Sequence, residues 1–324
     1  MAAAFSLRLI AWKIAKEPWD LPVQAKPAKM LNLAPQTHRS NMTTLFVNRL
    51  TAIDFSYLDP AAGLLGESWL VDIELDGSLD HQGMVLDFSE VKKQVKRCID
   101  QEFDHRLLVP ARYAHCRVQQ QEHRCDIRFQ LTSGETLVHS GPNSAVTLIQ
   151  AENITEESLI QAIIDRLQPL LPDNIQGLRL RLYAESITGA WYRYSHGLKH
   201  HAGNCQRIAH GHRSRIIIYR NGVRDQQLEA NWANRWRDIY IGTSSDLQDS
   251  VQQDNQLFYH FGYTANQGLF KLEIPSHRCY LVDSDTTVEN LAQHIADTLK
   301  REHPDDAFRV EAFEGVDKGA VGHS

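Results

Sequence analysis

Four residues in the second half of the chain have the types and spacing of a metal site with a reactive thiol beside it: His196, Cys205, His210 and His212. Side chains two residues apart in a strand share a face, so His210 and His212 point the same way and can chelate one ion. If the strand ending at His196 pairs antiparallel with the strand beginning at His210, His196 supplies a third nitrogen. Three histidine ligands with an open fourth position are typical of catalytic zinc. Because His-x-His also occurs by chance, the prediction of a Zn²⁺ site depends on the whole group.

The surroundings of Cys205 favour chemistry over packing. It lies in a polar, basic loop between Lys199 and Arg207, where positive charge makes a thiolate available as a nucleophile or base. The alternative, a small buried apolar side chain, is our interpretation of Cys98 and Cys279. The chain has 5 cysteines and no Cys-x-x-Cys pair, so we expect a cytoplasmic protein without a disulfide framework.

The composition excludes several classes of protein. A chain of 324 residues is long enough for about two domains. Its formal net charge of -6 argues against nucleic-acid binding through the bulk field. We therefore expect no nucleic-acid partner. No apolar run reaches the roughly 18 residues of a membrane span, so we expect no membrane partner either. Residues 1–41 are predicted to be a leader that is disordered or not translated, with the folded chain starting near Met42.

The elements that must position these residues come in the same order twice. Two alternating stretches predict strands, two stretches of helical spacing predict helices, and a further strand follows, at residues 44–50, 68–75, 88–99, 155–167 and 178–184. Residues 148–159 resemble residues 280–291, so that Glu157 aligns with Glu289, and residues 180–185 resemble residues 308–314. We therefore predict an α+β chain made of one fold duplicated in tandem.

Several motifs occur together in this order. The second half has Tyr-Arg-Tyr-Ser-His at 192–196, Cys205 followed by His-Gly-His at 210–212, Thr-Val-Glu at 287–289 and Val-Glu-Ala-Phe-Glu at 310–314. The first half has a turn-strand-helix stretch at 77–88 and Phe-Asp-His at 103–105. This set resembles the 6-pyruvoyltetrahydropterin synthase / 6-carboxytetrahydropterin synthase family.

The resemblance implies a fold and an assembly. The fold is two tandem T-fold (tunnelling-fold) domains, 42–187 and 188–324. Each domain would be an antiparallel four-stranded sheet with two helices on one face, and the sheets would join into a barrel in a homo-oligomer.

The two halves depart from the family pattern in opposite ways. In the first half, His-Gly-His is replaced by Leu65-Gly66-Glu67 and the early histidine position falls at Asp54 or Phe55, so this domain is expected to bind no zinc. The second half lacks the Asp-His pair. Since the family assembles its cysteine and its Asp-His pair from different subunits, the resemblance implies one composite site per chain. Zinc and Cys205 would come from the second half, and Asp104 and His105 from the first.

The resemblance also implies roles for individual residues. Cys205 is the expected base for side-chain protons, and His105, oriented by Asp104, is the expected acid or base on the other face of the substrate. Either Glu314 or Glu289 is expected to anchor the guanidine-like edge of the pterin through its carboxylate, and Thr287 is expected to bind the substrate beside it. Glu314 is also expected to be a catalytic residue. Glu157 and Glu185, the first-half counterparts of these two glutamates, are expected to be structural. Four cations could bind the triphosphate, although solvated charges on a strand face are the default interpretation: Lys199, Arg207, Arg213 and Arg215.

The implied reaction has more than one form. Our first expectation is a zinc lyase that converts 7,8-dihydroneopterin triphosphate to 6-carboxy-5,6,7,8-tetrahydropterin, releases acetaldehyde and triphosphate, and serves queuosine and 7-deazaguanine biosynthesis. The pyruvoyl type eliminates triphosphate and rearranges the side chain. Residues 206–209 separate Cys205 from His210, and this spacing favours neither type. A pterin aldolase and a non-catalytic pterin- or zinc-binding protein are the remaining alternatives.

Overall fold

The structure is a computed structural model that describes residues 31–32 and 42–324. Two residues of the predicted leader, Leu31–Asn32, form strand β1, which pairs antiparallel with β9 (Ile175–Ala184). The rest of that leader, residues 1–30 and 33–41, lies outside the described residues.

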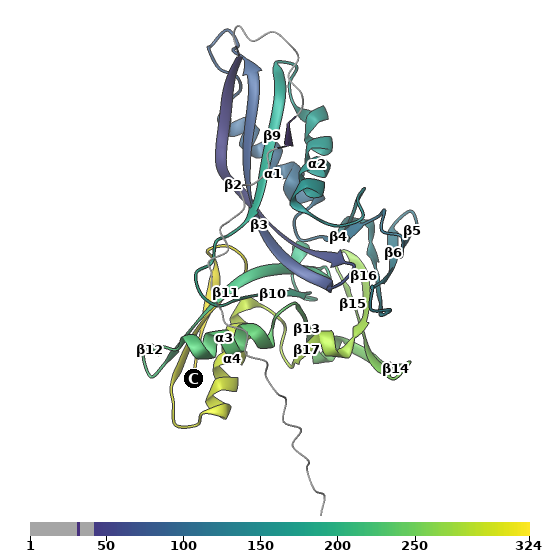
Figure 1. Cartoon of the computed structure of the whole chain (residues 1–324), viewed down its shortest axis with the longest axis vertical. Coiled ribbons are helices and arrows are strands. Elements are labelled where there is room, and N and C mark those ends of the chain that lie inside the picture. Colours follow the sequence, from purple (N-terminus) through teal and green to yellow (C-terminus); the bar gives the residue numbers. More distant parts are fainter. Residues whose placement is uncertain (1–30, 33–41) are drawn as a thin grey trace, which may run out of the picture.

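The first half is built on three long antiparallel strands (Figure 1), β9 followed in the sheet by β3 (Gly63–Ser78) and β2 (Met42–Asp59). Two helices, α1 (Phe88–Glu102) and α2 (Glu156–Leu167), close one apolar core with these strands. A capping box at Thr155 begins α2 and satisfies backbone N–H groups that have no partner inside the helix. The apolar positions of α2 recur at helical spacing and are all buried: Leu159, Ile160, Ile163, Ile164 and Leu167.

The second half repeats this plan. Its antiparallel strands run in the order β10 (Trp191–His196), β11 (His210–Arg220), β18 (Phe308–Phe313) and β19 (Gly319–His323). The helices are α3 (Gln226–Arg235) and α4 (Val288–Glu302), which close a second apolar core with the sheet. A short strand, β12 (Val223–Arg224), pairs with β11. Among the described residues, no helix is both long enough and apolar enough to cross a membrane.

Each sheet is larger than the predicted four antiparallel strands. In the first half, β4 (Leu107–Pro110) pairs parallel with β2, and β8 (Val146–Ile149) pairs parallel with β4. In the second half, β13 (Ile239–Thr243) and β17 (Cys279–Val282) extend the sheet beyond β10 in the same parallel way. The predicted α+β class and duplication are confirmed, and the sheets are mixed.

A third sheet joins the halves. Between its two parallel strands, each half inserts three antiparallel strands: β5 (Cys116–Gln120), β6 (Arg124–Gln130) and β7 (Thr136–Pro142) in the first, and β14 (Leu247–Gln253), β15 (Gln256–Ala265) and β16 (Gly268–Pro275) in the second. Antiparallel pairing of β16 with β7 makes one six-stranded sheet of the two insertions. Single 3-10 turns complete the chain: η1 (Asn143–Ala145), η2 (Gln168–Leu170), η3 (Asn204–Gln206), η4 (Ser244–Asp246) and η5 (Ser276–Arg278).

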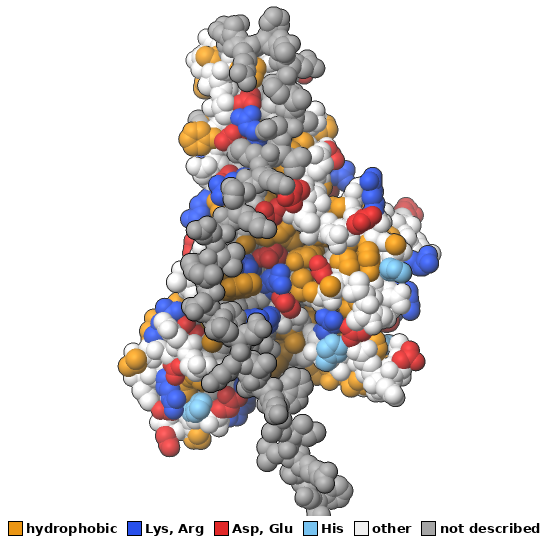
Figure 2. Space-filling view, viewed as in Figure 1, with side chains coloured by type: hydrophobic (Ala, Val, Ile, Leu, Met, Phe, Trp, Pro, Cys, Tyr) orange, Lys and Arg blue, Asp and Glu red, His pale blue; other side chains and the backbone are white. Residues whose placement is uncertain are grey.

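The two large sheets meet where β3 crosses β11. A Cβ atom on Gly66 would overlap the backbone carbonyl of Tyr194, and one on Gly211 would overlap the backbone of Gly66. Only glycine permits this approach. Beside the crossing, Ser56 Oγ donates to Ser195 Oγ over 2.7 Å, and both residues are buried. On the face shown in Figure 2, Lys and Arg side chains are interspersed with Asp and Glu. The crossing brings side chains of the two halves close together, as the third sheet does elsewhere.

Candidate active site

The three histidines meet at the end of the β10–β11 pair. His196 lies opposite His210 in the antiparallel register, as expected, and His212 follows on the same face. The ring centroids of His196 lie 4.3 Å from His210 and 5.2 Å from His212. One ligand nitrogen from each residue can be chosen so that all three lie within 4.8 Å of one another. We call His196, His210 and His212 the three-histidine group; all three are fully buried.

Two of the three outer nitrogens of the group are held by neighbouring acceptors. His196 Nδ1 lies 3.0 Å from the carbonyl of Thr286, and His210 Nδ1 lies 3.0 Å from the carbonyl of Arg207. Because a carbonyl only accepts, each Nδ1 carries the proton and each Nε2 lone pair points inward. His212 Nδ1 lies 3.4 Å from Asp54 Oδ1, a carboxylate of the first half.

The inner nitrogens fit a metal ion. His210 Nε2 is buried without a hydrogen-bond partner, and His196 Nε2 lies 3.2 Å from His212 Nε2. Burial lowers the pKa of His196 and of His210 well below the usual value, so both rings are neutral, the form that binds metals. A buried, unpartnered nitrogen facing two other imidazoles is the donor set that Zn²⁺ prefers.

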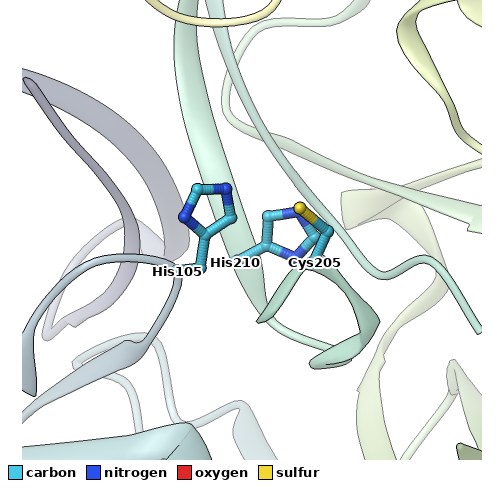
Figure 3. A group of neighbouring side chains, drawn as sticks. All are labelled: His105, Cys205 and His210. Carbon is cyan, nitrogen blue, oxygen red and sulfur yellow. The ribbon is translucent and has the colours of Figure 1, made fainter. Parts of the chain in front are cut away.

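The Asp-His pair of the first half reaches this group from the turn between α1 and β4. The ring centroid of His105 lies 5.2 Å from that of His210, and ligand atoms of His105, Cys205 and His210 lie within 4.8 Å of one another. In Figure 3 these three side chains point toward one another. Cys205 comes from η3, in the segment between β10 and β11. The predicted meeting of Cys205 with the Asp-His pair is therefore present within one chain.

His105 is held in a fixed, charged form. Its Nδ1 lies 2.6 Å from Asp104 Oδ2, while the other Asp104 oxygen accepts from the backbone N–H of Asp54 over 2.9 Å. Burial alone would lower the pKa of His105, but hydrogen bonds with Asp104 and Cys205 raise it to about 10. At neutral pH the ring is an imidazolium beside the thiol.

The predicted carboxylate anchors have separate positions. Glu314 follows β18, and its Oε1 lies 3.7 Å from His212 Nε2. Glu289 lies exposed in the first turn of α4, and Thr287 is the N-cap of that helix, its side chain accepting from the backbone N–H of Asn290. Among the contacts of the described residues, none joins Glu289 or Thr287 to the three-histidine group. The structure thus brings Glu314 to the site and leaves Glu289 and Thr287 at the helix start.

The triphosphate candidates all have protein partners. Lys199 lies 3.4 Å from Asp246, and Arg215 pairs with Glu185 and Asp317 at 3.0 and 2.7 Å. The guanidinium of Arg213 stacks over the Trp191 ring at 3.5 Å. Arg207 is only 4% exposed and donates to backbone carbonyls, which disfavours it as a triphosphate contact. Glu185 accepts a hydrogen bond from Arg215, a structural contact of the expected kind. Glu157 is exposed in the first turn of α2.

One register prediction needs correction. Tyr57 pairs with Leu65 on β2 and β3, as His196 pairs with His210 on β10 and β11. The first-half counterpart of His196 is therefore Tyr57, and not Asp54 or Phe55. The counterparts of His210 and His212 are Leu65 and Glu67, as predicted. Different lengths of chain join the two strands in each half, residues 60–62 against residues 197–209, and this hides the correspondence in the sequence.

Around Glu67 the counterpart of the site is filled by ion pairs. Arg193 Nε lies 2.7 Å from Asp238 Oδ1, and its Nη1 lies 3.3 Å from the Tyr57 hydroxyl and 3.7 Å from Glu67 Oε2. Asp238 follows α3 with φ of 56°, as His105 follows α1 with φ of 54°. We call Tyr57, Glu67, Arg193 and Asp238 the mirror cluster.

Sequence reasoning missed two charged residues at the site. Asp54 is 4% exposed, accepts from Ser68 Oγ and lies 3.0 Å from Lys318 Nζ. Burial alone would raise the pKa of Asp54, but His212 and Lys318 hold it well below the usual range. The sequence comparison marks Asp54 only as a position where the family pattern has a histidine and this chain does not. No sequence motif marks Lys318, because the turn between β18 and β19 brings it to Asp54 only in the folded chain.

Comparison with known proteins agrees with this arrangement of two similar halves. Residues 53–195 and residues 186–321 each match the family model described as 6-pyruvoyl tetrahydropterin synthase. The chain belongs to the 6-pyruvoyl tetrahydropterin synthase family. The two matches confirm the predicted tandem duplication of the family's T-fold.

The relatives found are distant. A protein of Pyrococcus abyssi is 21% identical over 41% of this chain and 76% of its own length, and one of Methanocaldococcus jannaschii is 28% identical over 45% and 89%; both are described as candidate 6-carboxy-5,6,7,8-tetrahydropterin synthases. Among solved structures, the 6-pyruvoyl tetrahydropterin synthase of Plasmodium falciparum is 18% identical with a TM-score of 0.36, covering 44% of this chain and 91% of that one. The Plasmodium vivax enzyme is 19% identical with a TM-score of 0.36, covering 46% and 94%.

Proposed function

We propose that the protein is a zinc-dependent lyase that converts 7,8-dihydroneopterin triphosphate to 6-carboxy-5,6,7,8-tetrahydropterin, releasing acetaldehyde and triphosphate. One observation carries the proposal. Cys205 and the Asp104–His105 pair, which come from different halves, converge on His210 of the three-histidine group. This geometry places a thiol and an imidazolium beside a set of metal donors, as proton transfer next to a metal-held hydroxyl requires.

The residues that would hold zinc are His196, His210 and His212, through the three Nε2 atoms that face one another. Bound there, Zn²⁺ would supply Lewis-acid chemistry to the hydroxylated side chain of the pterin. Asp54, Thr286 and Arg207 would fix the ring orientations through their contacts with the three Nδ1 atoms.

The residues of the chain itself divide the remaining work. In its thiolate form, Cys205 would accept a proton from the substrate side chain and become the thiol, and the His105 imidazolium, held by Asp104 at 2.6 Å, would return one. Glu314, whose carboxylate is 21% exposed beside His212, would accept the paired N–H groups of the pterin edge. The exposed start of α4 leaves Glu289 and Thr287 the weaker candidates for substrate binding.

The carboxy-type product is favoured by the names of the relatives, since both proteins compared above are described as candidate 6-carboxy-5,6,7,8-tetrahydropterin synthases. Queuosine or 7-deazaguanine biosynthesis is the pathway that would use this product. A non-catalytic binding protein is disfavoured because pterin or zinc binding alone requires no thiol-imidazolium pair.

The reaction products test this proposal. Zinc-loaded protein is incubated with 7,8-dihydroneopterin triphosphate, and the pterin and any acetaldehyde are identified by mass spectrometry. The proposal predicts equal amounts of 6-carboxytetrahydropterin and acetaldehyde. A 6-pyruvoyl product without acetaldehyde would assign the chain to the pyruvoyl type instead, and no turnover by folded, zinc-loaded protein would contradict the enzyme proposal. Cys116→Ala, on β5 of the third sheet, is the matched control for loss of a thiol.

A further inference from the structure

The side chain of Arg207 is a buried cation beside the site, and the proposed chemistry uses only the backbone carbonyl of this residue. It is 4% exposed and lies in the chain between Cys205 and His210. Its backbone N–H donates to Asn204 over 3.1 Å, which closes the turn bearing Cys205, and its carbonyl lies 3.0 Å from His210 Nδ1. The backbone of Arg207 thus holds the thiol and one member of the three-histidine group.

The side chain of Arg207 points into the other half. Its Nη1 donates to the backbone carbonyls of His105 and Asp104, over 3.2 and 3.4 Å. On the opposite side, the backbone of Asp54 accepts from the N–H of His105 over 2.6 Å. His105 has φ of 54°, which is uncommon for a residue with a side chain and persists only where the surroundings fix it. Arg207 and Asp54 hold this turn from its two sides.

The third sheet holds the guanidinium in place. Gln267, in the turn between β15 and β16, accepts from Arg207 Nε over 3.0 Å and donates through its own Nε2 to Asn204 over 3.0 Å. The backbone N–H of Gln267 also donates to Gln206 Oε1 over 2.6 Å, and the Tyr263 hydroxyl donates to the carbonyl of Gln206. One guanidinium therefore links the Cys205 turn, the His105 turn and the third sheet.

The chemistry of these acceptors argues against a role in overall stability alone. The acceptors of Arg207 are carbonyl and amide oxygens, and among the described residues no carboxylate forms a direct ion pair with it. Burial of a charge in this way is costly. Burial lowers the pKa of Arg207 to about 10, so the side chain is still protonated at neutral pH. The planar guanidinium of Arg207 donates to Gln267 on one side and to the carbonyls of Asp104 and His105 on another. The ammonium group of a lysine lacks this fixed geometry.

We propose that Arg207 is a positioning residue that sets the His105 imidazole against Cys205 Sγ, with Gln267 orienting the guanidinium. The proposal rests on the Cys205–His105 pair of the proposed function. Because Arg207 acts on the thiol by positioning His105, the effect of Arg207 can be measured as the reactivity of Cys205 without any pterin present.

The test is a double-mutant cycle on the full zinc-loaded chain. The rate at which iodoacetamide alkylates Cys205 is followed at pH 7.5 by mass spectrometry of the peptide that contains it. Because Arg207 holds the turn that sets the His105 ring beside Cys205 Sγ, and a cationic ring beside a thiol promotes its alkylation, Arg207→Met and His105→Gln should each slow alkylation on the order of tenfold. The variant with both changes should be no slower than His105→Gln alone, and Arg207→Lys should recover part of the rate.

Arg278→Met is the matched control. Arg278 also crosses between halves, since it donates to the carbonyl of Ala62 and pairs with Glu135 at 2.9 Å, but it lies at the third sheet. Its loss should lower the melting temperature and leave alkylation of Cys205 unchanged. Zinc content and melting temperature are measured for every variant.

Two results would overturn the proposal. One is a native alkylation rate in folded Arg207→Met, and the other is an equal slowing by Arg207→Met in the His105→Gln background. If Arg207→Met does not fold, Gln267→Met replaces it, with a smaller slowing expected that again disappears without His105; a native rate there has the same meaning. A further outcome is that alkylation of Cys205 depends on Arg207 and His105 as expected while the protein fails to turn over dihydroneopterin triphosphate. That result would refute the proposed function and leave the role of Arg207 standing.

Discussion

His212 and Glu67 occupy equivalent positions on β11 and β3, one residue after Gly211 and Gly66, and their surroundings have diverged. His212 faces Asp54 and the other members of the three-histidine group. Glu67 is 5% exposed; burial raises its pKa to about 6, although Arg213 and Arg193 act in the opposite direction. The same strand position therefore carries a metal donor in one half and a member of the mirror cluster in the other.

Glu67→Gln should change the pH dependence of stability. The folded pKa of Glu67 is raised above its ordinary value, so the stability it contributes is fully present below about pH 4.5 and lost as pH rises through about 6. Between pH 4 and pH 8 the free energy of unfolding should therefore shift in favour of the Gln variant by about 2 kcal/mol. Urea denaturation at both pH values measures this difference.

Glu135→Gln is the control of opposite sign. Burial alone would raise the pKa of Glu135, but hydrogen bonds from Arg278 and Gln256 lower it, so its ionised form stabilises the fold above its ordinary pKa. Its Gln variant should lose relative stability as pH rises. The same direction of change in both variants would contradict the burial assigned to Glu67.

Cys205→Ala and His212→Ala should separate turnover from metal binding. Cys205→Ala should keep its zinc and lose turnover by about a thousandfold, since it removes a proton acceptor and no member of the three-histidine group. His212→Ala should lose zinc as well. Elemental analysis beside a turnover assay checks both, with the exposed His277→Ala as control. Loss of zinc from Cys205→Ala would mean that the thiol is a ligand.

At the scale of the elements, the crossing of β3 over β11 brings the two halves within reach of each other. It places Asp54 against His212 and the Asp104–His105 turn against Cys205. The approach depends on Gly66 and Gly211, since neither position has space for a Cβ. The site is therefore as sensitive to this crossing as to its own side chains.

Gly66→Ala should lower the free energy of unfolding by about 3 kcal/mol and also lower turnover, because the new Cβ forces the strands apart. Gly262→Ala on β15 is the matched control. A Cβ there meets its neighbours at 3.4 Å or more, so stability and turnover should be nearly unchanged. Urea denaturation and the product assay measure both. Equal effects of the two substitutions would show that the crossing is looser than described.

The sequence predicted those elements whose pattern is strong and local. The helix at 155–167 and its repeat have buried residues at regular helical spacing, and the structure has α2 and α4 there. The three strands inserted in each half were not predicted, because strands such as Cys116–Gln120 and Leu247–Gln253 are short and mostly exposed. Their pairing across the halves joins residues far apart in the chain, which periodicity cannot indicate.

The candidate site shows the same division. His196, His210, His212 and Cys205 were found from local spacing, and the Asp-His pair from a motif. The position of Tyr57 was misassigned because the two hairpins differ in length, and only the hydrogen-bond register fixes it. The sequence marks Arg207 only as a candidate phosphate contact, because its burial is set by tertiary packing that no local pattern indicates.

The whole molecule has two similar halves with one set of chemistry. Only the second half has the three histidines, and the mirror cluster fills the corresponding place in the first. The zinc content should accordingly be about one ion per chain. Elemental analysis of the purified protein measures this, with His212→Ala as the control for zinc held elsewhere. Two ions per chain in the native protein would show a second site that this account does not contain.

We propose that one chain assembles one complete site from its two halves. The most direct measurement is the turnover of dihydroneopterin triphosphate by co-expressed, differently tagged Cys205→Ala and His105→Ala chains. As a control, native chains are co-expressed with the double variant, and about half of the native turnover is expected because half of the chains are intact. If each chain holds its own site, the mixture of single variants should be no more active than either variant alone. Recovery of about a quarter of the native turnover would mean that the two halves of a site come from different chains and would contradict the proposal.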